Sequence, residues 1–476
     1  MVQGAILLYA LALDKGLLAV ESLIHYTKTM YKPQYTLPEL MHRGYGSRLA
    51  LILESILIGF MVGLIVVFFR YLLSQTDTLR QGIYKVPHSR MYWLGWSATL
   101  ALIGLFLGWA AKVWPLIKGS GIPQIKGALA GSLPLNYREL PVKLLTGLLG
   151  LGAGLSLGRE GPSVQIGAYV GKGVLSIFPK SEQEQHWLIA SGSAAGVAAA
   201  FNAPLAGVVF VLEELQASFS PLFLACAMGA SMTADAVAGS FFGWGPVFDF
   251  RYIAVLSLKD IPWVMILGVS CGLLGDLFKR GLYWVLTGYD RCRIPQIIRP
   301  VIPLLVSVPL GLLWFDVLGG GHDLIESLAH GERTFSVLAL FLLLGGKILF
   351  TLLSYGSGTA GGIFLPLLVC GAITGDLLGL CLWQSGYIAE GQNLNFIILG
   401  MAAFFTSVVK APITGIVLIL EMSANFNHLG NLVLACLCAL ITSELIASRP
   451  VYVVLLERIL GRGNPPSGTP EGTQAA

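Results

Sequence analysis

Long apolar segments follow one another from about residue 46 onward, separated by short polar breaks. The segments 49–69 and 91–111 are each long enough to cross the roughly 30 Å hydrocarbon core of a bilayer as one helix. Two later charge-free segments are interrupted: 187–212 contains an Asn-Ala-Pro break, and 348–375 contains six glycines and a proline. Such interruptions predict partial helices that meet inside a membrane. The whole pattern predicts roughly fifteen to eighteen helical pieces, many shorter than a full crossing.

The composition supports this fold class and excludes several others. Only 12% of the 476 residues are charged and 55% are hydrophobic, with a mean hydropathy of +0.75, whereas a typical soluble domain is about 25% charged. Disordered, collagenous and disulfide-scaffold classes are excluded. The sequence therefore predicts an all-α multispanning membrane protein. Glycine is frequent, at 58 residues, which favours close helix packing and broken helices.

The remaining bulk features predict no cofactor, metal or nucleic-acid partner. The net charge of +4 comes without a basic run interleaved with aromatic residues, so nucleic-acid binding is not expected. The seven cysteines lie mostly in apolar segments without zinc-type spacing, and we interpret all of them as structural. No catalytic residues are predicted, and an enzyme is not expected.

Two end segments lie outside the expected membrane body. Residues 1–45 are interpreted as an N-terminal segment at the membrane surface or in the cytoplasm, because an apolar run there is broken by Asp14 and Lys15. Residues 456–476 are interpreted as a C-terminal tail that is rich in proline and glycine from Gly461 and is expected to be disordered.

An internal repeat organises the chain between these ends. The stretch 192–204 aligns without gaps with 400–412, an offset of 208, and the match continues through 214 and 422. A second match has an offset of 204 and aligns Gly-Pro and Leu-Pro pairs, followed in each copy by two glycines four residues apart. Residues 46–250 and 251–455 are therefore predicted to be two repeats of tilted and broken helices, inverted in the membrane with the substrate between them.

The two copies differ at two positions where the first copy carries a glutamate. Glu160 aligns with Phe364, and Glu214 aligns with Met422. Carboxylates in an apolar background are costly and usually functional. These two glutamates therefore break the pseudo-symmetry at the positions of greatest interest.

Three glycine-rich segments share one design. They are GSGIP at 119–123, GREGP at 158–162 and GGIFLP at 361–366. Proline is favoured in the first turn of a helix, and the preceding glycines free the backbone to expose its N–H groups. A helix start offers unpaired donors and partial positive charge. Three such starts that converge would bind an anion without a full positive charge.

These three motifs resemble the signature motifs of the CLC family of chloride channels and chloride/proton antiporters. The resemblance covers about residues 46–455 and includes the inverted repeat. It implies a homodimer in the lipid bilayer with a separate anion pathway in each subunit. By motif, Ser120 and Tyr452 would donate hydroxyl groups to chloride, and the backbone N–H groups of Ile363 and Phe364 would complete the chloride-binding site. The match at Tyr452 rests on an Arg-Pro-Val-Tyr stretch that only resembles the family pattern.

The same resemblance assigns the proton-transfer residues. Glu160 would be the gating and proton-transfer glutamate, supported by its neighbours Arg159 and Gly161. Glu214 would be the inner proton-transfer glutamate, and Glu213 a hydration or structural partner. Channel members of the family commonly lack a glutamate at the position of Glu214. The resemblance therefore favours a chloride/proton antiporter of the prokaryotic type, in the plasma (inner) membrane.

The chemistry of Glu160 can also be argued from its position alone. A carboxylate beside a helix start is a tethered anion that can occupy the site of a free anion, and protonation removes its reason to stay there. Anion and proton would then compete at one position. Without the flanking glycine and proline, Glu160 would instead be interpreted as a carboxylate at a helix N-terminus that stabilises the helix dipole. For Glu213 and Glu214, a helix end that emerges into water is the alternative.

Two alternative functions remain open at this point. The first is a passive chloride channel of the same fold. The second is an intramembrane hydrolase, since Gly356-Ser357-Gly358 superficially resembles a nucleophile setting that would also need a histidine within reach. His186, His322 and His428 lie mainly at segment edges and in loops, which disfavours this alternative.

A few positions depart from the family pattern or have no transport role assigned. Gln124 and Lys126 stand where many relatives carry glutamate, beyond the expected anion contacts. Ser120 favours chloride over nitrate, because nitrate-preferring relatives carry proline there. Lys143 is expected to pair structurally or to tune the local potential. Basic residues near both chain ends and in 279–299 place these segments in the cytoplasm by the positive-inside rule.

Overall fold

The structure is a computed structural model that describes residues 45–461 except 87–88, 179, 216–218, 249, 251–255, 330–334 and 390. By its internal contacts the chain divides into residues 1–50 and residues 51–476, and the second unit holds every motif discussed above. The predictions for residues 1–44 fall outside the described residues. The following paragraphs concern the second unit.

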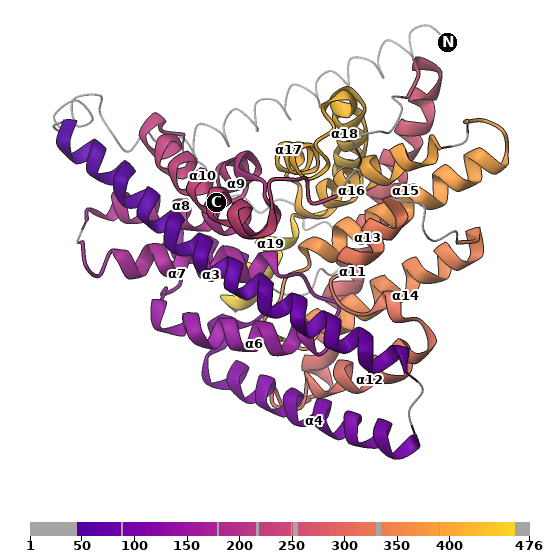
Figure 1. Ribbon diagram of the computed structural model, residues 1–476, viewed down its shortest axis with the longest axis horizontal. Helices are drawn as coiled ribbons and strands as arrows, with labels where there is room; N and C mark the ends of the chain where they lie inside the picture. The colour runs from indigo at the N-terminus through magenta and orange to yellow at the C-terminus, as the bar shows by residue number, and fades with distance from the viewer. Residues whose placement is uncertain are drawn as a thin grey trace, which may run out of the picture. The chain divides into compact units, whose positions relative to one another are not determined.

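The described residues form seventeen α-helices and no β-strand (Figure 1). The helices are α3 (Tyr45–Lys85), α4 (Arg90–Val113), α5 (Ile122–Leu129), α6 (Leu140–Gly152), α7 (Glu160–Val174), α8 (Glu182–Phe201), α9 (Pro204–Phe210), α10 (Pro221–Phe242), α11 (Ile261–Arg291), α12 (Val301–Leu313), α13 (His322–Ala329), α14 (Val337–Gly356), α15 (Phe364–Gln384), α16 (Asn393–Val409), α17 (Pro412–Ser423), α18 (Leu429–Leu445) and α19 (Val451–Ile459). Seven of these described helices are long and apolar enough to cross a membrane. The predicted fold class, an all-α multispanning protein with tilted and broken helices in inverted repeats, is confirmed.

Two helix pairs, α7 with α8 and α15 with α16, form the most closely packed contacts of the unit. Their glycines allow backbone to meet backbone: a Cβ atom on Gly167 would lie 1.9 Å from the carbonyl oxygen of Gly192. In the second pair, a Cβ atom on Gly371 would lie 2.3 Å from the carbonyl oxygen of Gly400. Small residues at helix crossings are the usual means of close packing in membranes. The glycines that align in the sequence repeat therefore make equivalent contacts.

Both predicted interruptions are present: α8 ends at the Asn-Ala-Pro break, and within 348–375 helix α14 ends at Gly356 and α15 begins at Phe364. The first of them has a counterpart in the second half. Helix α8 ends at Phe201, Asn202 adopts a left-handed conformation (φ 50°), and Pro204 begins α9. In the second half, Lys410 adopts φ 65° between α16 and α17, and Pro412 begins α17. Asparagine is among the residues that enter the left-handed region most readily. The same device thus breaks both copies of the repeat.

The two short helices that follow these breaks cap each other. The carboxylate of Glu213 accepts hydrogen bonds from the backbone N–H groups of Ile413 and Thr414, at 3.2 and 2.7 Å, at the start of α17. The carboxylate of Glu421 accepts reciprocal bonds from Leu205 and Ala206, at 3.0 and 2.7 Å, at the start of α9. A carboxylate at a helix start satisfies orphan donors and complements the helix dipole.

A buried lysine holds an equivalent loop in each half. The Lys143 ammonium donates to the carbonyl oxygens of Ile117 and Gly119, both at 2.8 Å. Lys347 donates to three consecutive carbonyls, the shortest bond reaching Gly319 at 2.8 Å. The loops also share left-handed glycines, at 119 and 121 in the first half and at 319 and 321 in the second. The expectation that Lys143 pairs structurally agrees with these contacts.

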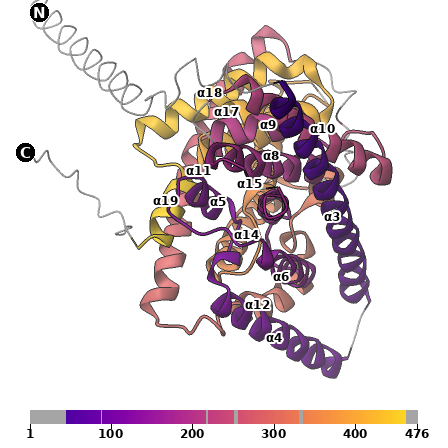
Figure 2. The same ribbon diagram turned by 90° about the vertical axis from the view of Figure 1, so that its left-hand side faces the viewer.

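Helices from both halves gather at one end of the unit: α9, α10, α17 and α18 lie together in both views (Figures 1 and 2). At the other end α4 lies along α12.

The predicted C-terminal tail, residues 456–476, needs one correction. Residues 456–459 belong to α19, which ends at Ile459, because the apolar face of this helix packs on α5. Residues 462–476 lie outside the described residues, and the repeat boundaries stay a prediction.

Candidate functional site

The three glycine motifs converge through their backbones. Gly158 and Gly362 exchange two hydrogen bonds, of 2.7 Å from the Gly158 amide and 2.8 Å from the Gly362 amide. Gly119 donates to the carbonyl of Thr359 at 3.1 Å and accepts from the amide of Gly361 at 3.0 Å. The GGIFLP segment therefore lies between the other two and binds to both. The structure thus brings together three segments that are far apart in the sequence.

The glycines of these motifs are required by how closely the segments approach. A Cβ atom on Gly161 would lie 2.8 Å from the Cβ atom of Ser120, and one on Gly362 would lie 3.1 Å from the Gly161 amide nitrogen. A Cβ atom on Gly121 would lie 2.3 Å from Oε1 of Gln165, in α7. Contacts below 3.0 Å cannot be made without displacing a neighbour. A side chain on Gly161 would therefore displace the Ser120 backbone and push the GREGP and GSGIP motifs apart.

Each motif ends at a helix start that has no hydrogen bond from its own N-cap side chain. The three starts are Ile122 in α5, Glu160 in α7 and Phe364 in α15. The N-cap of α5 is a left-handed glycine, Gly121, and a proline follows in its first turn. The first backbone N–H groups of a helix lack intrahelical partners and carry partial positive charge. This geometry offers donors to an anion.

The two hydroxyl groups expected at the site are both buried. Ser120 is 1% exposed, and its hydroxyl oxygen accepts a long hydrogen bond of 3.4 Å from the Ile122 amide. Tyr452 is fully buried in α19, and its hydroxyl has no hydrogen-bond partner among the described residues. Helix α19 lies beside α5, which begins directly after the Ser120 loop (Figure 2). A buried hydroxyl without a protein partner is unusual and is suited to a ligand.

Ile363 and Phe364 form the start of α15 and are both buried, at 0% and 2% exposure. The Phe364 ring packs against three other phenylalanine rings, with centroid distances of 4.5 Å to Phe405, 5.1 Å to Phe201 and 6.5 Å to Phe210. These rings come from α16 and from the ends of α8 and α9. Aromatic clusters of this kind are stabilising. The cluster fixes the start of α15 in place.

Glu160 is 1% exposed and lies at the first position of α7. Its carboxylate folds back over Gly158, where an added Cβ atom would lie 2.3 Å from Oε2 and 3.1 Å from the Leu365 amide nitrogen. Neither carboxylate oxygen has a hydrogen bond of regular geometry among the described residues. The nearest cation is Arg159, with Nε 3.9 Å from Oε1. The carboxylate therefore lies between the starts of α7 and α15.

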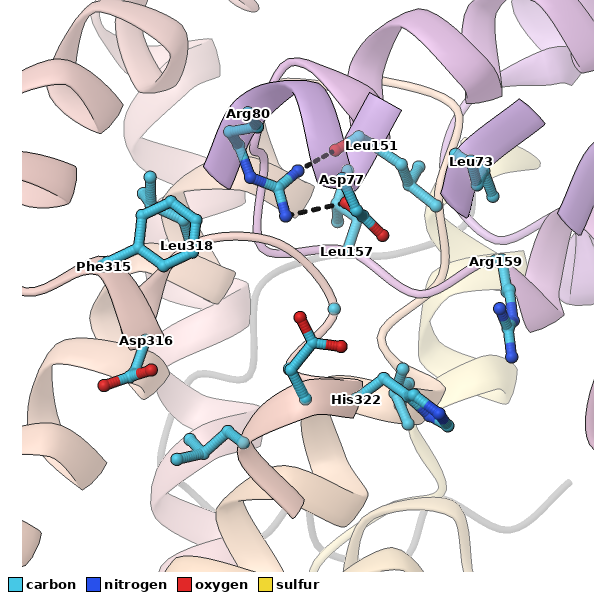
Figure 3. A pocket seen from close by; sticks show the side chains of 15 residues that line it. Leu73, Asp77, Arg80, Leu151, Leu157, Arg159, Phe315, Asp316, Leu318 and His322 are labelled. Carbon is cyan, nitrogen blue, oxygen red and sulfur yellow. Dashed lines mark hydrogen bonds and ion pairs between the residues drawn. The ribbon is translucent and has the colours of Figure 1, made fainter. Parts of the chain in front are cut away.

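A pocket whose lining includes Arg159, the residue before Glu160, is lined by both halves of the unit (Figure 3). Arg159 and His322 lie on one side of it, and Arg80 lies on the other, bound to Asp77 at 2.7 Å. Its lining includes Gly320, which stands in the second-half loop where the first-half loop carries Ser120. The lining mixes leucine and phenylalanine side chains with charged side chains of both signs.

Glu214 is 6% exposed and lies in a π-helical turn, Val211–Leu215, that continues α9. Its Oε1 accepts a hydrogen bond of 2.8 Å from the ammonium of Lys126 in α5. Its neighbour Glu213 points to α17 instead, where it caps the helix start. The two adjacent glutamates therefore have different partners. The expectation that Glu213 is a structural partner agrees with this contact.

Sequence reasoning missed two residues near the site. Lys126 was noted as a departure from relatives, but its ion pair with Glu214, 88 residues away, was not foreseen. Tyr355 is buried at the end of α14, and its hydroxyl lies 2.9 Å from the position that a Cβ atom on Gly119 would occupy. The opposite charges of Lys126 and the glutamate pair were a usable signal. Tyr355 has no local pattern that marks it.

The hydrolase alternative requires a histidine within hydrogen-bond reach of Ser357. The Ser357 hydroxyl donates to the Ser354 carbonyl at 2.7 Å and shares a 2.8 Å hydrogen bond with the Thr359 hydroxyl. No histidine is among the hydrogen-bond partners of Ser357 in the part of the chain that the structure describes. A serine nucleophile needs an adjacent general base.

The described residues contain no group of three or more His, Cys, Asp or Glu side chains suited to a metal ion.

The chain matches known proteins over most of its length. The family model described as "Voltage gated chloride channel" matches residues 103–444. Relatives named "H(+)/Cl(-) exchange transporter ClcA" from Salmonella paratyphi B and Salmonella arizonae are each 34% identical over 431 residues, which is 87% of this chain and 89% of theirs.

Solved structures of antiporters also match this chain over most of its length. The crystal structure of a slow cyanobacterial Cl⁻/H⁺ antiporter is 31% identical with a TM-score of 0.81, and the match covers 87% of this chain and 98% of that one. A CLC-type fluoride/proton antiporter is 24% identical with a TM-score of 0.71, covering 86% of this chain and 98% of that one; it supports the fold alone. From the family match and the identity to these relatives, together with the three converging motifs, it follows that this chain is a multispanning membrane protein of the voltage gated chloride channel (CLC) family.

Proposed function

We propose that this protein is a secondary active transporter that exchanges chloride for protons across a membrane. The observation that carries the proposal is the position of the Glu160 carboxylate, buried between the starts of α7 and α15 and folded over Gly158. A carboxylate there occupies a place that suits an anion. Relatives of the chain are named for H⁺/Cl⁻ exchange, which agrees with this chemistry.

The chloride site is proposed to consist of two hydroxyls and two amides. Ser120 and Tyr452 supply the hydroxyl donors, and the backbone N–H groups of Ile363 and Phe364 supply the others. The support is the burial of all four residues and the lack of a protein partner for the Tyr452 hydroxyl. Hydrogen-bond donors without full charge bind an anion while still permitting its release, whereas a lysine in contact would hold it more tightly.

Glu160 is proposed to be the gate and the outer proton-transfer group. When ionised, the carboxylate competes with chloride for the helix-start donors, and when protonated it has no electrostatic reason to remain there. Arg159 and Gly161 support it, Arg159 as the neighbouring cation at 3.9 Å and Gly161 as the close contact to the Ser120 loop. Alternate occupation by a tethered and a free anion couples the two ions.

Glu214 is proposed to be the inner proton-transfer group. Its carboxyl is nearly buried on a turn that packs against α5, the helix that carries the Ser120 loop at its start. Glu213 takes a supporting role by capping α17 and so holding the turn that carries Glu214. A second titratable group, separate from Glu160, would give protons a path separate from chloride.

The assembly and location are also proposals. We expect a homodimer with one anion pathway per subunit in the lipid bilayer, with residues 46–250 and 251–455 as the two inverted repeats. The location is expected to be the prokaryotic plasma (inner) membrane, in line with the bacterial relatives. Chemical cross-linking in membranes, compared with mass measurement of the purified protein, tests the dimer.

The function is tested with purified protein in liposomes that hold a chloride gradient and no proton gradient. Exchange predicts that protons move uphill until the chloride gradient is spent, and that a proton gradient drives chloride in the same way. Brisk chloride flux without proton movement would contradict exchange and support the passive channel. Absence of both fluxes in protein that remains folded would contradict chloride transport altogether.

A further inference from the structure

The inner proton-transfer candidate, Glu214, has a cationic partner. The Lys126 ammonium lies 2.8 Å from Oε1, and the side chains are 28% and 6% exposed, respectively. A carboxylate this deeply buried pays a large desolvation cost when it is ionised. An ammonium within hydrogen-bond distance offsets that cost and favours the ionised form. The pair is therefore more than an exposed surface ion pair, which would contribute little.

Lys126 also links the proton group to the anion loop. It lies in α5, an eight-residue helix that begins two residues after Ser120. The same helix packs on α19, where a Cβ atom on Gly127 would lie 2.8 Å from Cδ1 of Leu456, four residues beyond Tyr452. One short helix therefore carries the Ser120 loop at its start, supports the helix of Tyr452 along its side, and reaches Glu214 through Lys126.

The other groups around Glu214 leave Lys126 as its principal electrostatic partner among the described residues. The turn that carries Glu214 packs against α5, α8 and α9. Helix α9 contains no titratable residue, and those of α8 (Glu182, Glu184 and His186) lie in its first two turns. Glu213 is adjacent but is bound to the amides of α17.

We propose that Lys126 is a positioning residue that holds Glu214 in its ionised form between proton deliveries and thereby sets the pH range over which exchange operates. The inference rests on the proposed function, because it assigns Lys126 a role in proton transfer through Glu214. Loss of the ammonium leaves a buried carboxyl that takes up a proton more readily. The neutral form of Glu214 then persists to higher pH. The pH range over which Glu214 takes up protons shifts upward with it.

The experiment compares Lys126→Met, Lys126→Arg and a matched control in liposomes. The control is Arg280→Gln, which breaks an exposed ion pair of 2.6 Å with Asp276 on α11. Chloride-driven proton transport is measured over a pH series on the Glu214 side. We expect the midpoint for Lys126→Met to rise by about one pH unit or more. Lys126→Arg keeps the positive charge and the control leaves the pair intact, so both are expected to keep the wild-type midpoint. A structural ion pair without this role would lower the rate at every pH and leave the midpoint in place, which would overturn the inference.

A second measurement does not depend on whether Lys126→Met folds. The carbonyl stretch of protonated Glu214 in the infrared spectrum, assigned by its loss in Glu214→Gln, reports the ionisation state directly in the wild-type protein. We expect an ionised Glu214 at neutral pH, with the protonated signal appearing only on acidification. A Glu214 that is already protonated at neutral pH in the wild type would overturn the inference.

The outcomes separate this inference from the proposed function. Wild-type protein that moves chloride without protons would overturn exchange and, with it, the role of Lys126 in exchange. Wild-type protein that couples the two ions, together with an unmoved midpoint in Lys126→Met, would overturn the inference and leave the proposed function in place.

Discussion

Gly161 lies directly against Ser120, so closely that a Cβ atom on Gly161 would be 2.8 Å from the Cβ atom of Ser120 and 2.9 Å from its Cα atom and carbonyl oxygen. This contact joins the GREGP motif to the GSGIP motif. It places the helix that begins with Glu160 against the loop that carries the proposed chloride donor. The spacing between the proposed gate, Glu160, and the proposed chloride donor, Ser120, is therefore set by a glycine.

The first prediction is that Gly161→Ala weakens chloride binding. The added methyl group displaces the Ser120 backbone, and overpacking of this kind costs about 1–3 kcal/mol. We expect chloride affinity, measured by calorimetry on the purified protein, to fall by about tenfold. The matched control is Gly173→Ala in the same helix, where the nearest atom to the added Cβ would be 3.7 Å away. Equal affinity in the two variants would contradict the role of this contact.

The second prediction concerns Glu160. Glu160→Gln keeps the shape of the side chain but removes its ability to take up and release a proton. We expect chloride flux to continue while chloride-driven proton movement is lost, because the neutral amide no longer competes with chloride as a tethered anion. Both fluxes are measured in liposomes. Proton coupling that persists and still depends on pH would remove Glu160 from the gate.

The third prediction is that Glu214→Gln abolishes proton transport and retains chloride binding. The amide can still meet Lys126 but cannot carry a proton. The control is Glu421→Gln, which removes the charge of the carboxylate that caps the start of α9. This variant should have lower thermal stability without a specific loss of proton coupling. Unchanged proton coupling in Glu214→Gln would show that protons take another inner route.

The pattern of apolar and glycine residues was sufficient to predict the helical fold, the break at Asn202 and the convergence of the three glycine motifs. These features are local or repeated, since a proline after a left-handed residue breaks a helix wherever it stands, and aligned glycines mark equivalent helix crossings. The sequence also isolated Glu160 and Glu214, because charge is conspicuous in apolar segments and neither has a counterpart in the second copy.

Side-chain partners that depend on tertiary placement could not be predicted. The bond from Lys126 to Glu214 joins segments 88 residues apart, and no periodicity relates them. The reciprocal caps formed by Glu213 and Glu421 require the starts of α9 and α17 to lie beside the opposite helix end. Tyr355 reaches the loop at Gly119 from α14, a helix that carries no recognisable motif. The last helix extended four residues into the predicted tail because its apolar face packs on α5.

The fourth prediction is that Ser120→Pro shifts anion preference from chloride toward nitrate. Proline removes both the hydroxyl and the backbone N–H of this position, and the sequence resemblance associates proline here with nitrate preference. The ratio of nitrate to chloride flux in liposomes measures the shift. Ser120→Ala serves as the control, because it removes the hydroxyl alone and should weaken chloride without the same preference. An unaltered ratio in Ser120→Pro would refute the role of Ser120 in selectivity.

The fifth prediction uses the two buried lysines as a matched pair. Lys143→Met leaves the Ile117 carbonyl without its donor and the Gly119 carbonyl with the Gly361 amide alone, and Lys347→Met removes the donor from the loop at Gly319. Each buried acceptor left unpaired costs about 1–3 kcal/mol, so both variants should have a lower melting temperature than the wild type.

The two variants should differ in their effect on the anion. Lys143 holds the loop that carries Ser120, whereas the loop held by Lys347 has Gly320 at the corresponding position and offers no hydroxyl. Chloride affinity should therefore fall in Lys143→Met and stay close to wild type in Lys347→Met, as measured by calorimetry at a temperature where both remain folded. An equal loss of affinity in the two variants would mean that the loops contribute through stability alone. A loss confined to Lys143→Met would mean that the buried ammonium fixes the loop that carries the proposed anion donor, Ser120.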